Sequence, residues 1–286
     1  MKQEVLIVED DEALSEILSL VLRDMGFATT TLFEGTHAAD WVREHRPALV
    51  LLDLMLPGRS GYDICRELKL DRETNLIPIV IVTARTLHND RIRGLRVGAN
   101  YYLTKPFDIA QLQHAVRQAI DWRNTLEQSG TSGEIHFTLG SDTSYLEELN
   151  DLFSSLFRYT GLTTEQIFEL TTAVREMGAN AIEWGNGRQV DRPVMVMYRI
   201  DAEKITIVIR DQGSGFNLCE LSHACDEHSD PAAHLPVREQ KGLRVGGFGI
   251  FMTRGLVDEL EYNEPGNEVR LVKRLPRPAT DRVPSR

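Results

Sequence analysis

Acidic side chains in the first part of the chain stand directly after apolar runs. Glu9 and Asp10 follow one such run, and Asp53 follows another. Carboxylates that lie close together repel one another, and a hard divalent cation with oxygen ligands, such as Mg²⁺, relieves the repulsion. A carboxylate in such a cluster can act as a nucleophile. If the fold brings these residues together, they predict a Mg²⁺ site with Asp53 as its nucleophile.

The apolar periodicity predicts the elements that position these side chains. Short Val/Ile/Leu-rich runs alternate with helical patterns, which is typical of a parallel sheet covered on both faces. In such a doubly wound α/β fold the ligand site lies at the carboxyl ends of the strands, where the three carboxylates would converge. The expected strands are 4–9, 28–33, 48–52, 79–83 and 101–104, and the expected helices are 12–25, 35–45, 60–70, 89–97 and 108–124.

Residues 1–122 resemble the receiver domains of two-component response regulators, which have a flavodoxin-like fold. The resemblance is strongest at the carboxylates and at the ends of the later strands. It rests on the following sequences: Val8-Glu9-Asp10-Asp11, Asp53, Met55-Leu56-Pro57-Gly58, Gly61, Thr83-Ala84-Arg85, Gly98-Ala99 and Lys105-Pro106.

The resemblance implies a role for each of these polar residues. Asp53 would take a phosphoryl group from a sensor histidine kinase or a phosphotransfer protein, while Glu9 and Asp10 hold Mg²⁺. Lys105 would balance the new negative charge, and a cis bond is expected before the proline that follows it. Thr83 would bond a phosphoryl oxygen, and Tyr102 would be the aromatic side chain that reorients when that hydroxyl moves. Asp11 is expected to be peripheral.

Within that family the chain resembles the receivers of winged-helix transcription factors. Those receivers dimerise through an acidic and basic network on their fourth helix, fifth strand and fifth helix. Arg91, Arg93 and Arg96 supply basic groups here, but three positions where acids are common hold other residues. A homodimer is consistent with the resemblance, but the usual dimer geometry is not expected. The three departures are Asn100, Tyr101 and Gln111.

Two polar motifs in the second part of the chain could contribute to a ligand site. Glu176 and Asn180 are four residues apart on an expected helix, so both side chains lie on one face. Asp211 closes an apolar strand, and Gly213 and Gly215 let the chain turn and bring its backbone close to a flat ligand. Taken alone, the first motif could be a pair on a solvated helix face and the second a simple turn.

A third motif stands at the start of another expected helix. Gly246, Gly247 and Gly249 precede the helical pattern, and backbone N–H groups at a helix N-terminus attract anions. Taken alone, this glycine-rich segment could be a flexible loop. The three motifs occur in the order, and on the elements, that a nucleotide site would need.

This order resembles the GHKL superfamily of ATP-binding domains, which implies ATP and Mg²⁺ as cofactors. Asn180 would coordinate the Mg²⁺ bound to the phosphates, and Glu176 would be the general base. Asp211 would accept a hydrogen bond from the adenine amino group, and the glycines of both motifs would lie against the nucleotide. The long polar stretch 216–245 fits a nucleotide lid, in which Lys241 and Arg244 are candidate phosphate contacts.

The periodicity of the second part predicts an α+β two-layer domain, with helices on one face of a mixed or antiparallel sheet. The chain is therefore expected to contain a receiver domain at 1–122, a linker at 123–134, an ATP-binding domain at 135–275 and a disordered tail at 276–286. The expected strands of the second part are 135–139, 194–200, 205–210 and 268–273, and the expected helices are 145–159, 163 to about 185, and 248–260.

Within the GHKL superfamily the chain resembles the serine kinases that regulate sigma factors. The resemblance rests on Gly249-Ile250-Phe251-Met252, Val257-Asp258-Glu259 and Gly266-Asn267-Glu268-Val269. It implies phosphorylation of a serine or threonine on an antagonist protein, with a sigma factor as a further partner. Gly178 is a departure, since glycine inside a helix costs about 1 kcal/mol; we attribute it to close backbone packing near the nucleotide.

The leading hypothesis is a serine/threonine kinase that is controlled by phosphate on Asp53. One alternative is a nucleotide-dependent anti-sigma switch that binds its partner without catalysis. A third hypothesis, a hybrid histidine kinase, needs a phospho-accepting histidine on a helical hairpin, and the linker region offers His136 inside an expected strand.

Composition narrows the class of protein. The length of 286 residues favours two cores, and the net charge of −11 argues against direct DNA binding. No apolar run is long enough to span a membrane and no signal peptide is expected, so a cytoplasmic location is predicted.

Zinc binding is a minor alternative for the polar stretch 216–245, because the spacing of its Cys and His residues fits no known zinc pattern. Its candidate ligands are Cys219, His223, Cys225, His228 and His234.

Overall fold

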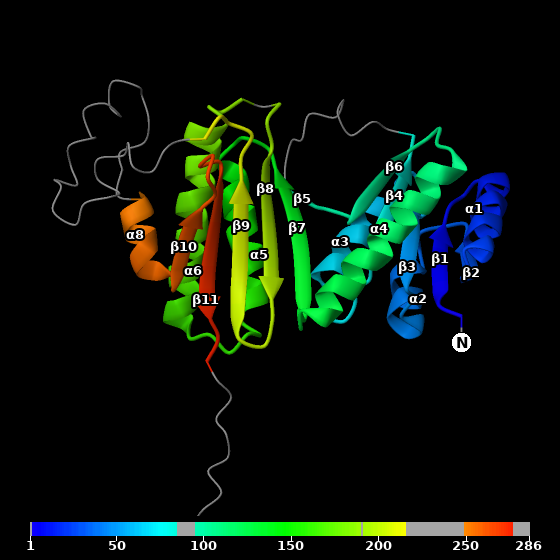
Figure 1. The fold of residues 1–286 in the computed structure, drawn as a ribbon, viewed down its shortest axis with the longest axis horizontal. Helices are drawn as coiled ribbons and strands as arrows, with labels where there is room; N and C mark the ends of the chain where they lie inside the picture. Colours follow the sequence, from blue (N-terminus) through cyan, green and yellow to red (C-terminus); the bar gives the residue numbers. More distant parts are fainter. Residues whose placement is uncertain (1, 85–94, 190, 216–248, 277–286) are drawn as a thin grey trace, which may run out of the picture. The chain divides into compact units, whose positions relative to one another are not determined.

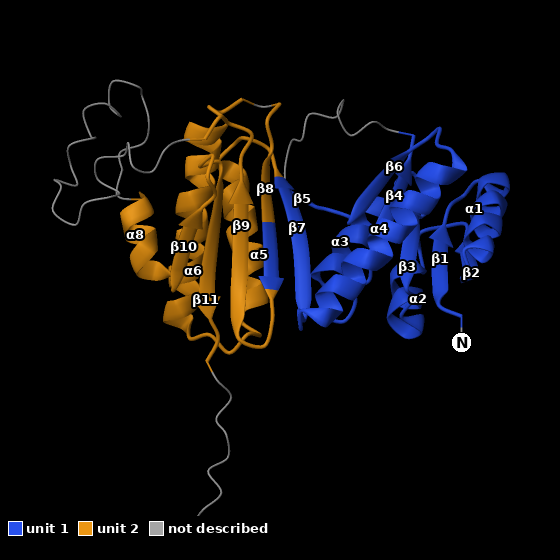
Figure 2. Ribbon diagram, viewed as in Figure 1, with its two compact units in different colours: residues 1–138, 197–199 blue, residues 139–196, 200–286 orange. Residues whose placement is uncertain are grey.

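The computed structural model describes residues 2–84, 95–189, 191–215 and 249–276. The chain divides into two compact units (Figure 2). The first contains residues 1–138 together with 197–199, and the second contains residues 139–196 and 200–286. Among the described residues, no helix has the length and apolar character needed to cross a membrane.

The first unit is built on a five-stranded parallel sheet (Figure 1). β3 and β4, two of the three inner strands, are buried along their whole length, as expected for strands covered on both faces. The strand order is β2-β1-β3-β4-β6, which confirms the predicted doubly wound arrangement. The strands are β1 (Glu4–Val8), β2 (Ala28–Leu32), β3 (Leu49–Asp53), β4 (Ile79–Thr83) and β6 (Tyr101–Thr104).

Helices cover both faces of this sheet, and successive residues of each strand alternate between two cores. Val5 and Ile7 of β1 pack with α1 and α4, whereas Leu6 and Val8 pack with α2 and α3. This alternation follows from the two-residue period of a strand. The helices are α1 (Glu12–Asp24), α2 (Ala38–His45), α3 (Gly61–Leu70) and α4 (Ile109–Gln128).

The structure differs from the sequence prediction after β4. Residues 95–97 were predicted to end a helix, but they form strand β5 (Leu95–Val97), while residues 89–94 lie outside the described part of the chain. β5 lies beside β7 (Gly133–Leu139), and the N–H of Gly98 donates to the carbonyl of His136 at 2.7 Å. The strand therefore depends on a partner far away in the sequence.

Regular structure also covers most of the predicted linker 123–134. α4 continues to Gln128, and β7 begins at Gly133. The described residues 129–132 between them contain no helix or strand. His136 lies within β7, not on a helix.

Glu134 is the buried polar centre of this region. Its carboxylate accepts hydrogen bonds from Trp122 Nε1 at 3.0 Å, His136 Nε2 at 2.8 Å and Arg199 Nε at 2.6 Å. Burial alone would raise the pKa of Glu134, but the hydrogen bonds from His136 and Trp122 and the charge of Arg199 lower it to about 2. The carboxylate is thus held in its charged form at the junction of α4 and β7.

The second unit has helices on one face of a sheet, as predicted (Figure 1). Its strands follow the order β10-β11-β9-β8, and β11 is antiparallel to both of its neighbours. The predicted helix 248–260 is too long, since residues 259–260 belong to β10. The elements are α5 (Ser144–Phe157), α6 (Thr164–Asn180), the π-helix η1 (Ala181–Gly185), β8 (Val194–Ile200), β9 (Lys204–Arg210), α8 (Gly249–Leu256), β10 (Glu259–Tyr262) and β11 (Glu268–Arg274).

Helix α6 is fixed at its start and packs closely at its middle. Thr163 and Gln166 form a capping box at the N-terminus of the helix. A Cβ added to Gly178 would lie 2.5 Å from Cδ2 of Leu146 on α5. The glycine therefore permits close packing of α6 against a core leucine of α5, which is the contact that explains this departure from helix propensity.

Replacing Glu134 with Gln should lower the free energy of unfolding of the first unit by about 3 kcal/mol at pH 7, because the carboxylate pKa lies about 2.5 units below its usual value. The depressed pKa stabilises the fold above about pH 4.5, and this contribution is lost as the pH falls towards 2. The difference in the free energy of unfolding between wild type and Glu134→Gln should therefore become smaller as the pH is lowered from 7 to 3. Urea unfolding at pH 7, 5 and 3, followed by the fluorescence of Trp122 in a background with the other tryptophans changed to Phe, measures it.

The exposed pair Arg123 and Glu127 offers a matched control on α4. Glu127→Gln should change the free energy of unfolding by less than about 0.5 kcal/mol at each pH. A pH-independent loss in Glu134→Gln would contradict the assigned charge state.

Candidate functional site

The predicted carboxylate cluster forms at the carboxyl ends of β1 and β3. These strands are adjacent and parallel, so Glu9 and Asp53 lie at the same edge of the sheet. Both are buried, Asp10 is exposed, and one oxygen atom from each of the three lies within 4.8 Å of the others. Three carboxylates at this separation form a donor set that suits Mg²⁺.

Lys105 is the positive partner of this cluster. Its Nζ lies 2.9 and 2.8 Å from the two carboxylate oxygens of Glu9, and 2.5 Å from Oδ2 of Asp53. Burial raises the pKa of Glu9, although the contacts with Lys105 oppose this. Burial lowers the pKa of Lys105, but its hydrogen bonds to Asp53 and Glu9 outweigh that effect and raise it. The lysine therefore remains charged.

The two oxygens of Asp53 have different partners. Oδ2 contacts Lys105, while Oδ1 accepts a hydrogen bond from the backbone N–H of Met55 at 2.9 Å. Asp53 is 6% exposed. Gly61 packs against its backbone, because a Cβ added to Gly61 would lie only 2.0 Å from the carbonyl oxygen of Asp53. The nucleophile candidate is thus held by a cation on one side and a backbone donor on the other.

The predicted switch residues lie on the neighbouring strands. Thr83 ends β4 and is buried, and its carbonyl accepts from the N–H of Lys105 at 2.8 Å. Tyr102 on β6 is 40% exposed, and its hydroxyl accepts a hydrogen bond from the N–H of Ala99 at 3.2 Å. The bond before Pro106 is cis, as expected.

Some residues of the motifs have structural roles that the sequence did not predict. Asp11 caps α1, since its carboxylate accepts from the N–H of Leu14 at 3.0 Å. Asn100 Oδ1 accepts from the N–H of Ile79 at 2.9 Å. Gln111 forms a capping box with Asp108 at the start of α4. These contacts account for two of the three positions where related receivers have acids.

The first two groups of the predicted nucleotide site lie beside the start of α8. A Cβ added to Gly249 would lie 3.2 Å from Oε2 of Glu176 and 3.4 Å from Nδ2 of Asn180. α6 therefore presents both side chains, one turn apart, directly to the first residue of α8. Because Gly249 has no side chain, its backbone can lie close to the Glu176 carboxylate and the Asn180 amide.

Asp211 follows β9 and lies in a setting that only glycines permit. Its Oδ1 accepts from the N–H of Gly213 at 2.8 Å, and burial raises the pKa of its carboxyl group. A Cβ on Gly185 would lie 2.2 Å from Cγ of Asp211, and one on Gly213 would lie 2.2 Å from the carbonyl oxygen of Gly185. Gly215 has a φ of 75° and lies against the carbonyl of Pro265.

Sequence reasoning found Asp211, Gly213 and Gly215 but missed Gly185 and its neighbour Asn186. The available signal was the Gly-Asn pair that follows the helix bearing Glu176 and Asn180. The remaining candidates lie outside the described residues. These are Lys241, Arg244, Gly246, Gly247, the five possible zinc ligands Cys219, His223, Cys225, His228 and His234, and the basic residues Arg91 and Arg93.

Two family matches agree with this geometry. Residues 5–117 match the response regulator receiver domain, and residues 139–273 match the histidine kinase-like ATPase domain. The chain contains a receiver domain followed by a GHKL-type ATPase domain. The carboxylate cluster belongs to the receiver domain, and Glu176, Asn180, Asp211 and Gly249 belong to the ATPase domain.

Curated relatives are similar to this chain over part of its length. The DNA-binding response regulator MtrA of Mycobacterium tuberculosis is 49% identical over 117 residues, which is 41% of this chain and 50% of that protein. The uncharacterized transcriptional regulatory protein YkoG of Bacillus subtilis is 42% identical over 134 residues, or 46% of this chain and 55% of that protein. The chain spans about half the length of the curated relatives it matches. The absence of DNA binding here stays a prediction from net charge.

Two solved structures are also similar to part of the chain. One is a response regulator from Chloroflexus aurantiacus, with 30% identity and a TM-score of 0.39 over 42% of this chain and 99% of that one. The other is the receiver domain of the sensor histidine kinase PA1611 from Pseudomonas aeruginosa, with 31% identity and a TM-score of 0.39 over the same shares.

Replacing Gly185 with Ala should lower the affinity for ATP at least about tenfold. The new Cβ would overlap the Asp211 carboxylate, and losing a hydrogen bond to a charged group costs about 1.5–3 kcal/mol. Titration with a fluorescent ATP analogue measures the change. Gly255→Ala on α8 is the control, because among the described residues no atom lies within 4 Å of its added Cβ. Equal affinities for Gly185→Ala and wild type would refute this view of the site.

Proposed function

We propose that phosphorylation of Asp53 controls an ATP-dependent protein serine/threonine kinase activity of the ATPase domain. Its substrate would be an antagonist protein, in a partner switch that also involves a sigma factor. The observation that best supports catalysis is the placement of Glu176 beside Asn180 and Gly249, because it puts a carboxylate base next to a candidate phosphate site. The receiver site on the same chain supports control by phosphorylation.

In the receiver domain, an oxygen of Asp53 attacks the phosphorus of a phosphohistidine on a sensor kinase or phosphotransfer protein. The phosphorus–nitrogen bond of the donor breaks as the acyl phosphate forms. Lys105 already contacts Asp53 Oδ2, so its charge is in place to balance the phosphoryl oxygens. Glu9, Asp10 and Asp53 would hold Mg²⁺, which would supply further neutralisation of that charge.

The switch residues then respond to the new phosphoryl oxygens. Thr83 donates its hydroxyl to one of them. Tyr102 gives up its contact with the N–H of Ala99 and turns inward. This motion changes the surface formed by β6 and its neighbours, which supports a regulatory role for the domain.

In the ATPase domain, Glu176 accepts the proton of a serine or threonine hydroxyl on the protein substrate. The hydroxyl oxygen attacks the γ-phosphorus, and the bond between that phosphorus and the β,γ-bridging oxygen breaks to release ADP. Asn180 is placed to hold Mg²⁺, which would supply charge neutralisation at the phosphates. Asp211 accepts a hydrogen bond from the adenine amino group and so selects adenine nucleotides.

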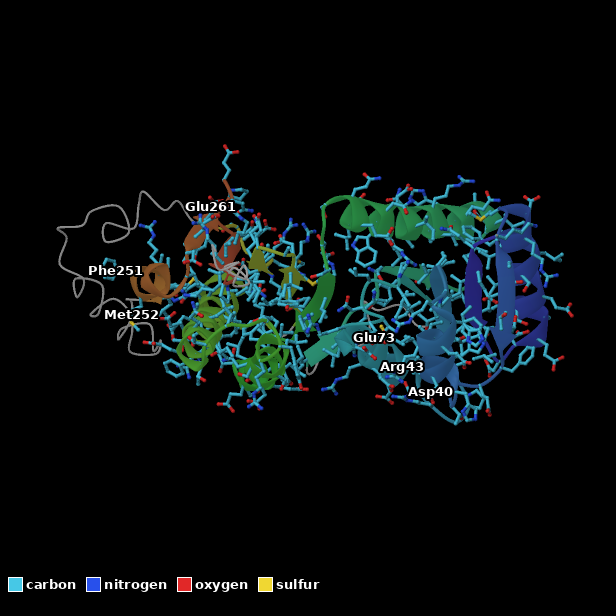
Figure 3. The ribbon with its side chains drawn as sticks, turned by 90° about the horizontal axis from the view of Figure 1, so that it is seen from below. Asp40, Arg43, Glu73, Phe251, Met252 and Glu261 are labelled. Atoms are coloured by element: carbon cyan, nitrogen blue, oxygen red, sulfur yellow. The ribbon has the colours of Figure 1, made fainter. Side chains whose placement is uncertain are left out.

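A second candidate function is a nucleotide-dependent switch that binds its partner without phosphorylating it. Two apolar side chains favour it. Phe251 and Met252 project from α8, are 65% and 52% exposed, and closely follow Gly249 (Figure 3). Exposed apolar groups beside a nucleotide site suit a partner surface whose shape depends on the nucleotide.

Incubation with γ-labelled Mg-ATP and captured partner proteins should give acid-stable label on a small partner. The amount should change when Asp53 carries a beryllofluoride mimic. Glu176→Ala should reduce the rate at least about a hundredfold, since general base catalysis contributes 10²–10⁴-fold. Glu165→Ala, an exposed glutamate on the first turn of α6, is the control and should keep the wild-type rate. Partner capture that depends on nucleotide but gives no label would favour the second candidate.

Acetyl phosphate should label the receiver domain with an acid-labile phosphate. Asp53→Asn should reduce that label to background, because the amide is not a nucleophile at this site. Asp63→Asn, an exposed aspartate on α3, should retain it. Phosphate on another residue of Asp53→Asn, including His136, would count against the assignment.

A further inference from the structure

We propose that Asn186 positions Asp211 and thereby sets the selectivity of the ATPase domain for adenine nucleotides. Asn186 lies outside all three nucleotide motifs, and it would act through Asp211 without touching the base. The inference rests on the proposed binding of ATP in this domain. It does not depend on whether the domain transfers phosphate.

Asn186 is fully buried and uses both ends of its side-chain amide. Its Oδ1 accepts a hydrogen bond from the backbone N–H of Gln212 at 2.8 Å. Its Nδ2 donates to the hydroxyl of Ser141 at 3.0 Å and to the carbonyl of Arg192 at 2.7 Å. Ser141 also donates to the same Arg192 carbonyl. These three segments are therefore joined through one side chain.

The chemistry of the partners fixes the orientation of this amide. A backbone N–H can only donate, so the oxygen of Asn186 must face Gln212. A carbonyl can only accept, so the nitrogen must face Arg192. Aspartate at this position could keep the contact with Gln212, but it has no donor for Arg192 and would place two acceptors 2.7 Å apart.

The contact with Gln212 acts on the turn that presents Asp211. The N–H of Gln212 belongs to the peptide group that follows Asp211, so this hydrogen bond restrains the backbone from which the Asp211 side chain projects. The residue before Asn186, Gly185, lies against the carboxylate itself, with its added Cβ only 2.2 Å from Cγ. Gly185 and Asn186 together therefore hold both the side chain and the backbone of the adenine acceptor.

The opposite side of the turn is held by the loop between β10 and β11. The N–H of Asp211 donates to the carbonyl of Asn267 at 3.0 Å, and Asn267 Nδ2 donates to the carbonyl of Gly213 at 3.4 Å. Asn263 Oδ1 in turn accepts from the N–H of Asn267 at 3.1 Å. With this side fixed, losing Asn186 would release the turn towards the helix.

The end of the helix explains why Asn186 can reach the turn. The backbone N–H of Asn186 donates to the carbonyl of Ala181 at 2.8 Å, and this hydrogen bond closes the π-helix η1. A π-turn adds a residue to the helical repeat and changes where the following side chains lie. Because η1 continues directly from α6, the helix that bears Glu176 and Asn180 also ends in the residue that holds the Asp211 turn.

Titration of the full chain with fluorescent ATP and GTP analogues tests the inference. Wild type should bind the ATP analogue much more tightly. Asn186→Ala should lower the ratio of the GTP to the ATP dissociation constant about tenfold or more, since the turn that carries Asp211 loses its buried hydrogen bond to Asn186. The affinity for GTP should change little, because the phosphate contacts come from other residues. A purely structural defect would lower the affinities for the ATP and GTP analogues by the same factor.

Three further variants separate positioning from general destabilisation. Asn186→Asp should also lose selectivity, and Ser141→Ala, which removes one partner of the amide, should lose part of it. Asn150→Ala on α5 is the control for removing a partly buried asparagine and should keep the wild-type ratio. The inference is overturned if every Asn186 and Ser141 variant that binds nucleotide keeps the wild-type ratio of the GTP to the ATP dissociation constant. It is also overturned if these variants lose affinity for ATP and GTP equally.

The outcome for wild type distinguishes this inference from the proposed function. Wild type that selects ATP but never phosphorylates a partner would remove the kinase and leave the role of Asn186 intact. Wild type that binds neither analogue would overturn ATP binding and this inference together.

Discussion

A buried carboxylate at the end of a strand is the constraint on which both units depend. In the receiver domain, Asp53 and Glu9 share one edge of the sheet, and their repulsion would destabilise it without a nearby cation. Lys105 supplies that cation through contacts with both residues. Lys105, which directly follows β6, therefore lies beside the carboxyl ends of β1 and β3. The same lysine lies 2.5 Å from Oδ2 of Asp53 and so places a positive charge directly beside this carboxylate.

The ATPase domain holds its buried carboxylate in a different way. Asp211 receives a hydrogen bond from the N–H of Gly213, and Gly185 provides the space for its carboxylate. Burial raises the pKa of Asp211, because a buried carboxylate loses hydration and no lysine lies beside it in the way that Lys105 lies beside Asp53 among the described residues. Such a group suits the recognition of a neutral amino group, whereas Asp53 suits covalent chemistry. The two domains thus place the same residue type in different surroundings, a lysine beside Asp53 and glycines beside Asp211.

Local patterns predicted the elements whose causes are local. The parallel strands of the first unit and the placement of Glu176 and Asn180 on one face of a helix followed from spacing alone. Strand β5 could not be predicted, because residues 95–97 pair with β7, which lies farther along the chain. Gly185 and Asn186 were missed for the same reason, since each matters through a contact with the turn after β9. Periodicity records which face of an element is buried but not which distant segment it meets.

Phosphate on Asp53 would change the charge balance that Lys105 now satisfies. An acyl phosphate would carry about −1.5 to −2 charges where the carboxylate carries one, and the single lysine would then divide its contacts between the phosphoryl oxygens and Glu9. Because Lys105 closely precedes α4, any displacement of its loop reaches that helix first. Trp122 of α4 donates to the buried Glu134 of β7, which is held in its charged form. A shift of α4 would therefore have to move or break a charge-assisted contact in the first unit.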